Sequence, residues 1–261
     1  MGGFLLEAET LTTPLSKLPG FDAQKAPVLS VDTHLPAVPH ERMLEQALRA
    51  RFMAPPVWQP EFVQERAYLD RPMSRAAVLL GLVMRDEPMV LLTRRANHMS
   101  THSGQVAFPG GKVDPEDTDV RHTALREAHE EVGLNPALVH VLGELPTYTT
   151  GSAFVITPVV GLVEPGFEAV ANPSEVAQVF EVPLSFLMNP AHHRRHAHEA
   201  QGVRREWYSM PYKPATTKLS NGSNASNDSN AANPETEYFI WGATAGMIRN
   251  FYRFLLASNS L

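Results

Sequence analysis

Hydrophobic residues in this 261-residue chain fall mainly into short runs, and such runs predict strands. Residues 77–85 and 89–95 are rich in β-branched and other apolar side chains, and the turn-like residues 86–88 between them predict a hairpin of buried strands. The same pattern predicts further strands at residues 105–113, 138–145, 153–163, 176–183 and 206–212. Most of these runs follow one another without a helix, which favours antiparallel pairing.

Three segments instead have the period of an amphipathic helix. Residues 41–52 place apolar side chains at helical spacing, and the prolines at 55 and 56 stop that helix. Residues 119–132 form a second predicted helix, which Gly133 ends. A third helix near the C-terminus has one apolar stripe, made by Met247, Ile248, Phe251, Phe254 and Leu255.

These elements suggest one main domain preceded by an arm. Residues 1–35 have no clear period, so we expect residues 1–70 to be an N-terminal arm that carries one packing helix. Residues 71–261 would form the main domain. The polar, low-complexity run at about 214–234 cannot bury enough apolar area to offset the entropy of ordering it, so we expect a disordered insertion there.

Composition narrows the possible functions. The formal net charge of -6 argues against a nucleic-acid partner, because such proteins usually present a basic face to phosphate. The absence of cysteine excludes disulfides, thiolate zinc sites and cysteine nucleophiles. No run approaches the roughly 20 apolar residues of a membrane span, and the N-terminus lacks a secretory pattern, so we expect a cytoplasmic protein without a membrane partner. The oligomeric state stays open.

The second predicted helix is unusually acidic. Because a helix turns about 100° per residue, Glu127, Glu130 and Glu131 fall within an arc of about 100° and share one side. Such close carboxylates repel one another unless a cation lies among them, and hard oxygen ligands suit Mg²⁺ or Mn²⁺. A metal in this setting can promote attack of water on a diphosphate, with a carboxylate as general base. The simpler alternative is a solvated helix face.

The segment from Gly111 to Leu134 resembles the Nudix box, which favours the metal site. The box runs Gly, five residues, Glu, seven residues, Arg-Glu, an apolar residue, any residue, Glu-Glu, any residue, Gly and an apolar residue. Gly111 supplies the first glycine and residues 126–134 supply the second half in register. Asp117 replaces the first Glu, and eight residues instead of seven separate it from Arg126. The resemblance implies an α/β fold, the Nudix α/β/α sandwich with a mixed central sheet.

The resemblance also assigns roles to residues of the helix. Glu127, Glu130 and Glu131 would hold Mg²⁺ or Mn²⁺. The catalytic residues would be Glu127, the favoured general base, Glu130, and Arg126, which would orient a carboxylate.

Residues 91–111 resemble the signature of the coenzyme A diphosphatase branch of this family. The resemblance implies that the substrate contacts Thr93, Arg95, Gly104, Phe108, Gly110 and Gly111. Ser100 stands where the signature has a second Arg, for which Arg94, Arg194 and Arg195 are possible substitutes. The implied reaction is hydrolysis of coenzyme A, or its thioesters, to 4'-phosphopantetheine and adenosine 3',5'-bisphosphate.

Two other functions stay open. The chain could act on ADP-ribose, NADH or another nucleoside diphosphate derivative, since the box is common to the family, or it could be a noncatalytic binding module. Among the remaining candidates, the histidine-rich residues 192–198 favour an exposed basic edge over a metal site. Glu175 and Glu181 are interpreted as charges on strand surfaces, although either could approach the metals when the chain folds back.

Overall fold

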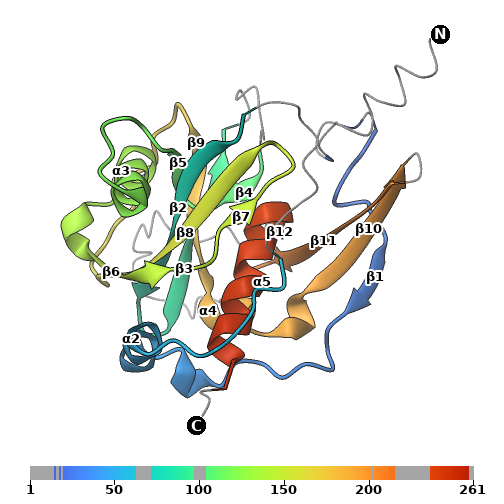
Figure 1. The fold of residues 1–261 in the computed structure, drawn as a ribbon, viewed down its shortest axis with the longest axis horizontal. Helices are drawn as coiled ribbons and strands as arrows, with labels where there is room; N and C mark the ends of the chain where they lie inside the picture. Colours follow the sequence, from blue (N-terminus) through green and yellow to red (C-terminus); the bar gives the residue numbers. More distant parts are fainter. Residues whose placement is uncertain are drawn as a thin grey trace, which may run out of the picture.

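The computed structural model describes residues 15, 18, 20–62, 72–96, 104–200, 203–214 and 236–258, and Figure 1 shows how they are arranged. The expected domain boundary near residue 70, Ser100 and all but the first residue of the expected insertion at 214–234 lie outside the described residues. None of the helices in these described ranges is long and apolar enough to cross a membrane.

The larger of two sheets is mixed. It contains β2 (Ser74–Met84), β3 (Pro88–Arg95), β4 (Val106–Ala107), β5 (Gly110–Lys112), β6 (Val139–Glu144), β7 (Tyr148–Thr149), β8 (Phe154–Val163) and β9 (Val176–Pro183). The main path runs β4-β3-β2-β8-β6, with β5 on β2, β7 on β8 and β9 on β3. The expected hairpin is the antiparallel pair β2 and β3, whereas β2 and β8 are parallel. The sheet is therefore mixed, as predicted.

The strand predicted at residues 105–113 is divided in two. Residues 106–107 pair with β3, whereas residues 110–112 pair with β2, so the chain changes partner at Phe108 and Pro109. Gly110 permits this change, because a Cβ there would lie 2.4 Å from the Ala77 carbonyl oxygen. The periodicity of the segment could not reveal that two neighbouring strands share it.

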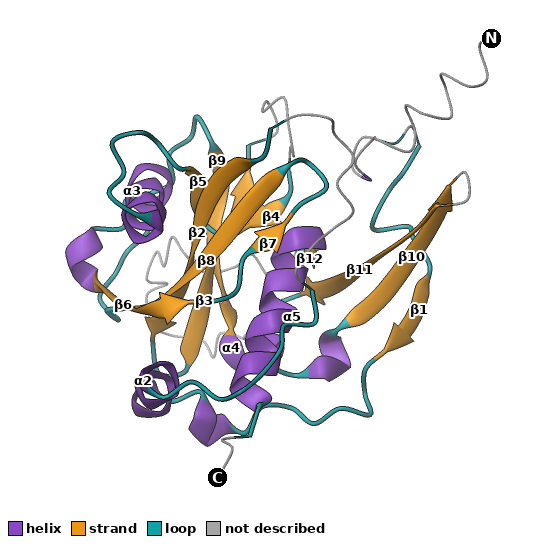
Figure 2. Cartoon of the chain, viewed as in Figure 1, coloured by secondary structure: helices purple, strands orange, loops and turns teal. Residues whose placement is uncertain are grey.

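Helices cover both faces of the mixed sheet (Figure 2). On one face, α3 (Val120–Val132) packs on β2 and β5, with Ala124, Ala128 and Val132 buried in the core beneath it. On the other, α5 (Gly242–Leu256) packs its apolar stripe between the two sheets, and α2 (Glu45–Met53) joins the same core. The expected α/β/α sandwich is confirmed. The remaining short helices are η2 (His40–Arg42), η3 (Pro136–Leu138), α4 (Leu184–Leu187) and η4 (Pro190–His192).

A second sheet was not foreseen as a separate unit. Its strands β1 (Val28–Val31), β10 (Arg194–Ala200), β11 (Val203–Tyr212) and β12 (Tyr238–Trp241) are antiparallel in that order. The interpretation of residues 192–198 as an exposed basic edge is wrong at its centre, since His193 is 0% and His196 2% exposed. His196 stacks on Trp207 and forms a hydrogen bond with Ser209, both on the neighbouring β11. At the far end of β11, Tyr212 is directly opposite Tyr238.

Candidate active site

The acidic helix α3 begins and ends where local signals place it. The Asp119 side chain caps it by accepting hydrogen bonds from two backbone N–H groups of the first turn, at 2.9 and 2.8 Å. Gly133 ends it in the left-handed conformation, with φ 69°. Ala124 and Ala128 are fully buried, and their small side chains bring the helix close to the sheet. The helix is thereby fixed against the loop that follows β5.

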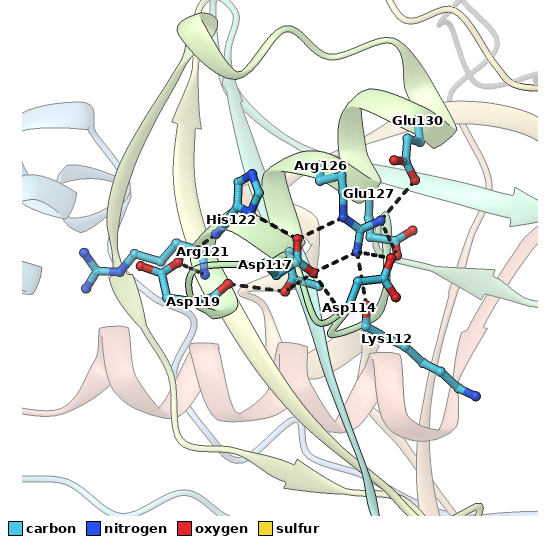
Figure 3. A network of polar contacts seen from close by, with 10 residues as sticks. Lys112, Asp114, Asp117, Asp119, Arg121, His122, Arg126, Glu127 and Glu130 are labelled. Carbon is cyan, nitrogen blue, oxygen red and sulfur yellow. Dashed lines mark hydrogen bonds and ion pairs between the residues drawn. The ribbon is translucent and has the colours of Figure 1, made fainter.

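Asp117 braces Arg126 in spite of being shorter than the expected Glu. One carboxylate oxygen of Asp117 accepts from Arg126 Nε at 3.0 Å and the other accepts from Nη2 at 2.9 Å (Figure 3). The Thr123 hydroxyl and the Asp114 N–H also donate to Asp117. These donors, the Arg126 guanidinium first, hold the pKa of Asp117 well below its usual range. Although one extra residue separates Asp117 from Arg126, Asp117 therefore still binds the guanidinium at two points.

The same guanidinium also holds two of the predicted metal ligands. Arg126 Nη1 donates to Glu127 at 3.0 Å and to Glu130 at 3.1 Å, and Nη2 donates to the Lys112 carbonyl at 3.2 Å (Figure 3). Asp114 lies 3.6 Å from Nη2. Four carboxylates thus surround one cation, and this part of the molecule carries an excess of negative charge.

Glu131 lies deeper than the other two predicted ligands. It is 3% exposed, accepts a hydrogen bond from the Gly110 N–H at 3.3 Å and lies 3.9 Å from Arg95 Nη1. Burial raises the pKa of Glu131 to about 8, and burial also raises the pKa of Glu127. Glu175 adds to both shifts through its charge, so it lies close to this site. The sequence favoured a strand-surface charge for Glu175 and left its approach to the metal site open as an alternative, with which this proximity agrees.

The loop glycines make room for the carboxylates. A Cβ on Gly111 would lie 2.3 Å from Glu127 Oε1, so only glycine leaves this place for the carboxylate. Gly110 instead offers its N–H to Glu131. Both residues of the expected substrate loop therefore lie in direct contact with the acidic helix.

The other expected substrate contacts are placed differently. The Thr93 hydroxyl donates to the Ala107 carbonyl at 3.2 Å, and Phe108 is buried in the core beside α5. The Thr93 hydrogen bond joins β3 to β4, and contact of Thr93 or Phe108 with substrate stays a prediction. Arg95 is different, because its Nε is buried and has no hydrogen-bond partner in the described part of the chain. Gly104 donates its N–H to the Arg95 carbonyl at 3.2 Å.

The residues present fit a hard divalent cation. Glu127, Glu130 and Glu131 offer oxygen donors, and the negative excess around Arg126 leaves charge for a cation to neutralise. Within the described ranges, no three acidic or histidine side chains already converge as a metal cluster. Glu127 and Glu130 instead point to Arg126, so they would have to exchange this partner for the metal.

Two further candidates are structural. Glu181 is 8% exposed and forms a two-point ion pair with Arg85, at 2.7 and 3.2 Å, so the interpretation as a strand-surface charge is wrong for it. His193 donates from Nε2 to the Leu187 carbonyl at 2.8 Å and accepts from Arg249 at Nδ1 at 3.0 Å. Both nitrogens of His193 are therefore occupied by protein partners.

A glycine loop and an acidic helix, mounted on a mixed sheet between two helical layers, define a hydrolase of the metal-assisted type. A sequence model of the NUDIX domain matches residues 73–210. Proteins named uncharacterized Nudix hydrolase NudL, from Yersinia pestis (strain Pestoides F) and Yersinia pseudotuberculosis serotype O:1b, are 38% identical over 193 residues, which is 74% of this chain and 85% of theirs. The chain belongs to the Nudix family. It is a hydrolase of phosphoanhydride bonds in nucleoside diphosphate derivatives, and such hydrolases generally use divalent metal ions.

Solved structures of the family are also similar to this chain. The MutT protein of Methanosarcina mazei Go1 is 22% identical, with a TM-score of 0.37 over 46% of this chain and 83% of its own. The NUDIX domain of Shewanella oneidensis NrtR, complexed with ADP ribose, is 20% identical, with a TM-score of 0.35 over 44% of this chain and 75% of its own.

Proposed function

We propose that this hydrolase cuts the diphosphate of coenzyme A, or of its thioesters, to 4'-phosphopantetheine and adenosine 3',5'-bisphosphate in the cytoplasm. The observation that carries the proposal is the position of Arg95, a residue of the coenzyme A diphosphatase signature. Arg95 has a buried Nε without a hydrogen-bond partner among the described residues, and its Nη1 lies 3.9 Å from Glu131 of the acidic helix. A guanidinium in this place can donate to a phosphate oxygen held beside the carboxylates.

The carboxylates of α3 would divide the work. Glu127, Glu130 and Glu131 would hold Mg²⁺ or Mn²⁺, which when bound neutralises phosphate oxygens and lowers the pKa of the attacking water. Glu127 lies against Gly111 and Arg126, and as the general base its carboxylate would accept the proton of that water. Arg126, fixed at two points by Asp117, orients Glu127 and Glu130. Glu175 is the nearby carboxylate that could replace Glu127 as the base.

A substrate panel tests the proposal. The purified protein is incubated with coenzyme A, ADP-ribose or NADH, with and without Mg²⁺ or Mn²⁺, and the products are resolved by mass. We expect adenosine 3',5'-bisphosphate and 4'-phosphopantetheine only with metal, and faster turnover of coenzyme A than of the other two. Faster turnover of ADP-ribose or NADH would overturn the substrate while leaving a hydrolase. No turnover of any of the three would instead favour the noncatalytic module.

A further inference from the structure

A pocket lies where the edges of the two sheets meet. The Thr244 hydroxyl at the start of α5 donates to the Val106 carbonyl at 3.1 Å, which fixes the end of β12 beside β4. Next to this contact is a cavity of about 430 Å³, walled by residues 21–24, by Arg94 with residues 104–106, and by residues 237–239 with Trp241. The first wall comes from a segment that precedes the matched NUDIX domain.

This pocket shares a backbone wall with the candidate active site. Arg94 and Arg95 are neighbours at the end of β3, where the pairing with β9 changes register between them. Arg95 approaches Glu131 of α3, whereas Arg94 lines the pocket. Gly104 and Gln105, which line the pocket, are hydrogen-bonded to the Arg95 backbone. Gly104 donates its N–H to the Arg95 carbonyl at 3.2 Å, and the Gln105 carbonyl accepts from the Arg95 N–H at 3.0 Å. Two consecutive residues at the end of β3 therefore border the candidate active site and the pocket, so one long substrate is a suitable ligand for both.

The charges of the pocket favour an anionic group. No carboxylate in the described part of the chain forms an ion pair with Arg94. Of the two acids in the walls, Asp22 is already paired with Lys25 at 2.9 Å, and Glu237 is exposed to solvent. By contrast, the pocket beside Arg249 has its cation paired with Asp32 at 2.8 Å and Glu61 at 2.7 Å. Arg94 thus has no carboxylate partner among the described residues, so an anion in the pocket can pair with it.

The size and the aromatic walls favour a nucleoside. The volume is at the lower end of the roughly 300–1,000 Å³ found for small-molecule sites, so the pocket can hold one end of coenzyme A and not the whole. Phe21, Phe239 and Trp241 contribute aromatic surface. Phe21 is itself held by an edge-to-face contact with Trp207, at 5.4 Å between ring centroids. A flat base with an attached phosphate fits these walls better than the uncharged pantetheine arm.

We propose that this pocket binds the 3'-phosphoadenosine end of coenzyme A, with Arg94 paired to the 3'-phosphate and residues 21–24 closing the pocket. The inference rests on the proposed function, because it extends the same substrate from its diphosphate to its nucleoside end. It gives Arg94, which lies outside the signature residues, the task of distinguishing coenzyme A from dephospho-coenzyme A.

The test compares these two substrates, which differ only in the 3'-phosphate. For the wild-type protein we expect a lower KM for coenzyme A. Arg94→Gln should raise the KM for coenzyme A by roughly 10- to 100-fold, the loss expected for a charged hydrogen bond, with kcat almost unchanged. It should leave dephospho-coenzyme A unaffected. Arg94→Lys should restore part of the difference, and the surface variant Arg49→Gln, whose residue pairs with Glu45 on α2, should change nothing.

A binding measurement separates this inference from the proposed function. Calorimetric titration without metal should show tighter binding of adenosine 3',5'-bisphosphate than of 5'-AMP, and Arg94→Gln should abolish that difference. If the wild-type protein leaves coenzyme A intact, the proposed function fails. The titration still shows whether the pocket binds the 3'-phosphate through Arg94. If coenzyme A is cut but Arg94→Gln affects both substrates equally, or neither, the pocket assignment is overturned.

Discussion

Two regions of this molecule gather arginine and carboxylate side chains, and their charge balances differ. At α3, the guanidinium of Arg126 alone has four carboxylates within 4 Å, namely Asp114, Asp117, Glu127 and Glu130. Around Arg249 on α5, the cations Arg249, Arg195 and Arg253 lie within 4 Å of the acids Asp32, Glu61 and Glu206, so the charges of this second group are close to balanced. The first group lies on the face of the mixed sheet that α3 covers, and the second joins the N-terminal segment to the second sheet.

Burial and pairing explain why only one of these regions is a candidate for catalysis. Arg249 is 2% exposed, is paired with both acids and lies against the ring faces of Tyr208 and Tyr252. Such a cation is already neutralised, so it stabilises the fold and has no charge left for a ligand. The carboxylates around Arg126 exceed their cation and therefore favour a further positive ion. An imbalance of charge, more than its density, marks the reactive region.

Replacing one carboxylate of the acidic region should have the largest effect. Glu130→Gln should lower turnover by about 10²- to 10⁴-fold, because it removes a metal ligand from the site. The fold should survive, since the Glu130 side chain is 52% exposed. Turnover at saturating metal and a thermal melt measure the two effects. Glu144→Gln is the matched control, because Glu144 is a surface acid paired with Arg121 of the same helix. Turnover of Glu130→Gln within twofold of wild type would remove Glu130 from the site.

Removing the cation of the balanced region should instead affect stability. Arg249→Leu leaves the buried Asp32 without its partner, which should cost about 3–5 kcal/mol of unfolding free energy in urea titrations. Turnover per folded molecule should be unchanged. Arg253→Gln is the matched control, because the Arg253 side chain is 41% exposed and its loss should lower the unfolding free energy by less than about 1 kcal/mol. Equal losses in the two variants would contradict the difference in burial.

The balanced region should also make stability depend on pH. Burial lowers the pKa of His193 to about 4, below its usual value of 6.5, and its Nδ1 already accepts from Arg249. The unfolded chain therefore binds a proton first as pH falls. Stability should be constant above pH 6.5 and should decrease between pH 6.5 and about 4, by no more than about 3 kcal/mol from this group. Urea midpoints across this range, compared with those of His193→Gln, measure the contribution. If the urea midpoint of His193→Gln depends on pH as strongly as that of the wild type, the pH dependence comes from another group.

Local signals explain what the sequence revealed about the fold. Asp119 and Gly133 are a cap and a terminator, so the limits of α3 could be predicted to within one residue. Alternating and continuous apolar runs likewise predicted β2, β3, β8 and β9. In each case the information is contained in residues close together in the chain.

Partners distant in the sequence explain what could not be predicted. His196 is buried because Ser209 and Trp207 lie beside it on β11, and the short strand β1 exists because β10 offers it an edge. Glu175 approaches the acidic helix because its carbonyl accepts from the Ala96 N–H at the end of β3, at 2.8 Å. No periodicity shows such pairings. The candidate site could therefore be proposed from residues contiguous in sequence, whereas the approach of Glu175 from a distant loop could only be left open as an alternative.

The pairing of Tyr212 with Tyr238 has a consequence for the evolution of this fold. Since these two residues are opposite each other in the ladder, the chain leaves and re-enters the second sheet at one point. The entropy of closing a connection grows only with the logarithm of its length, so each doubling costs about 0.6 kcal/mol. Insertions and deletions between these two tyrosines are therefore nearly neutral for the register of the sheet. A sequence alignment that penalises every inserted residue equally would therefore overstate the divergence between two relatives that differ only in the length of this connection.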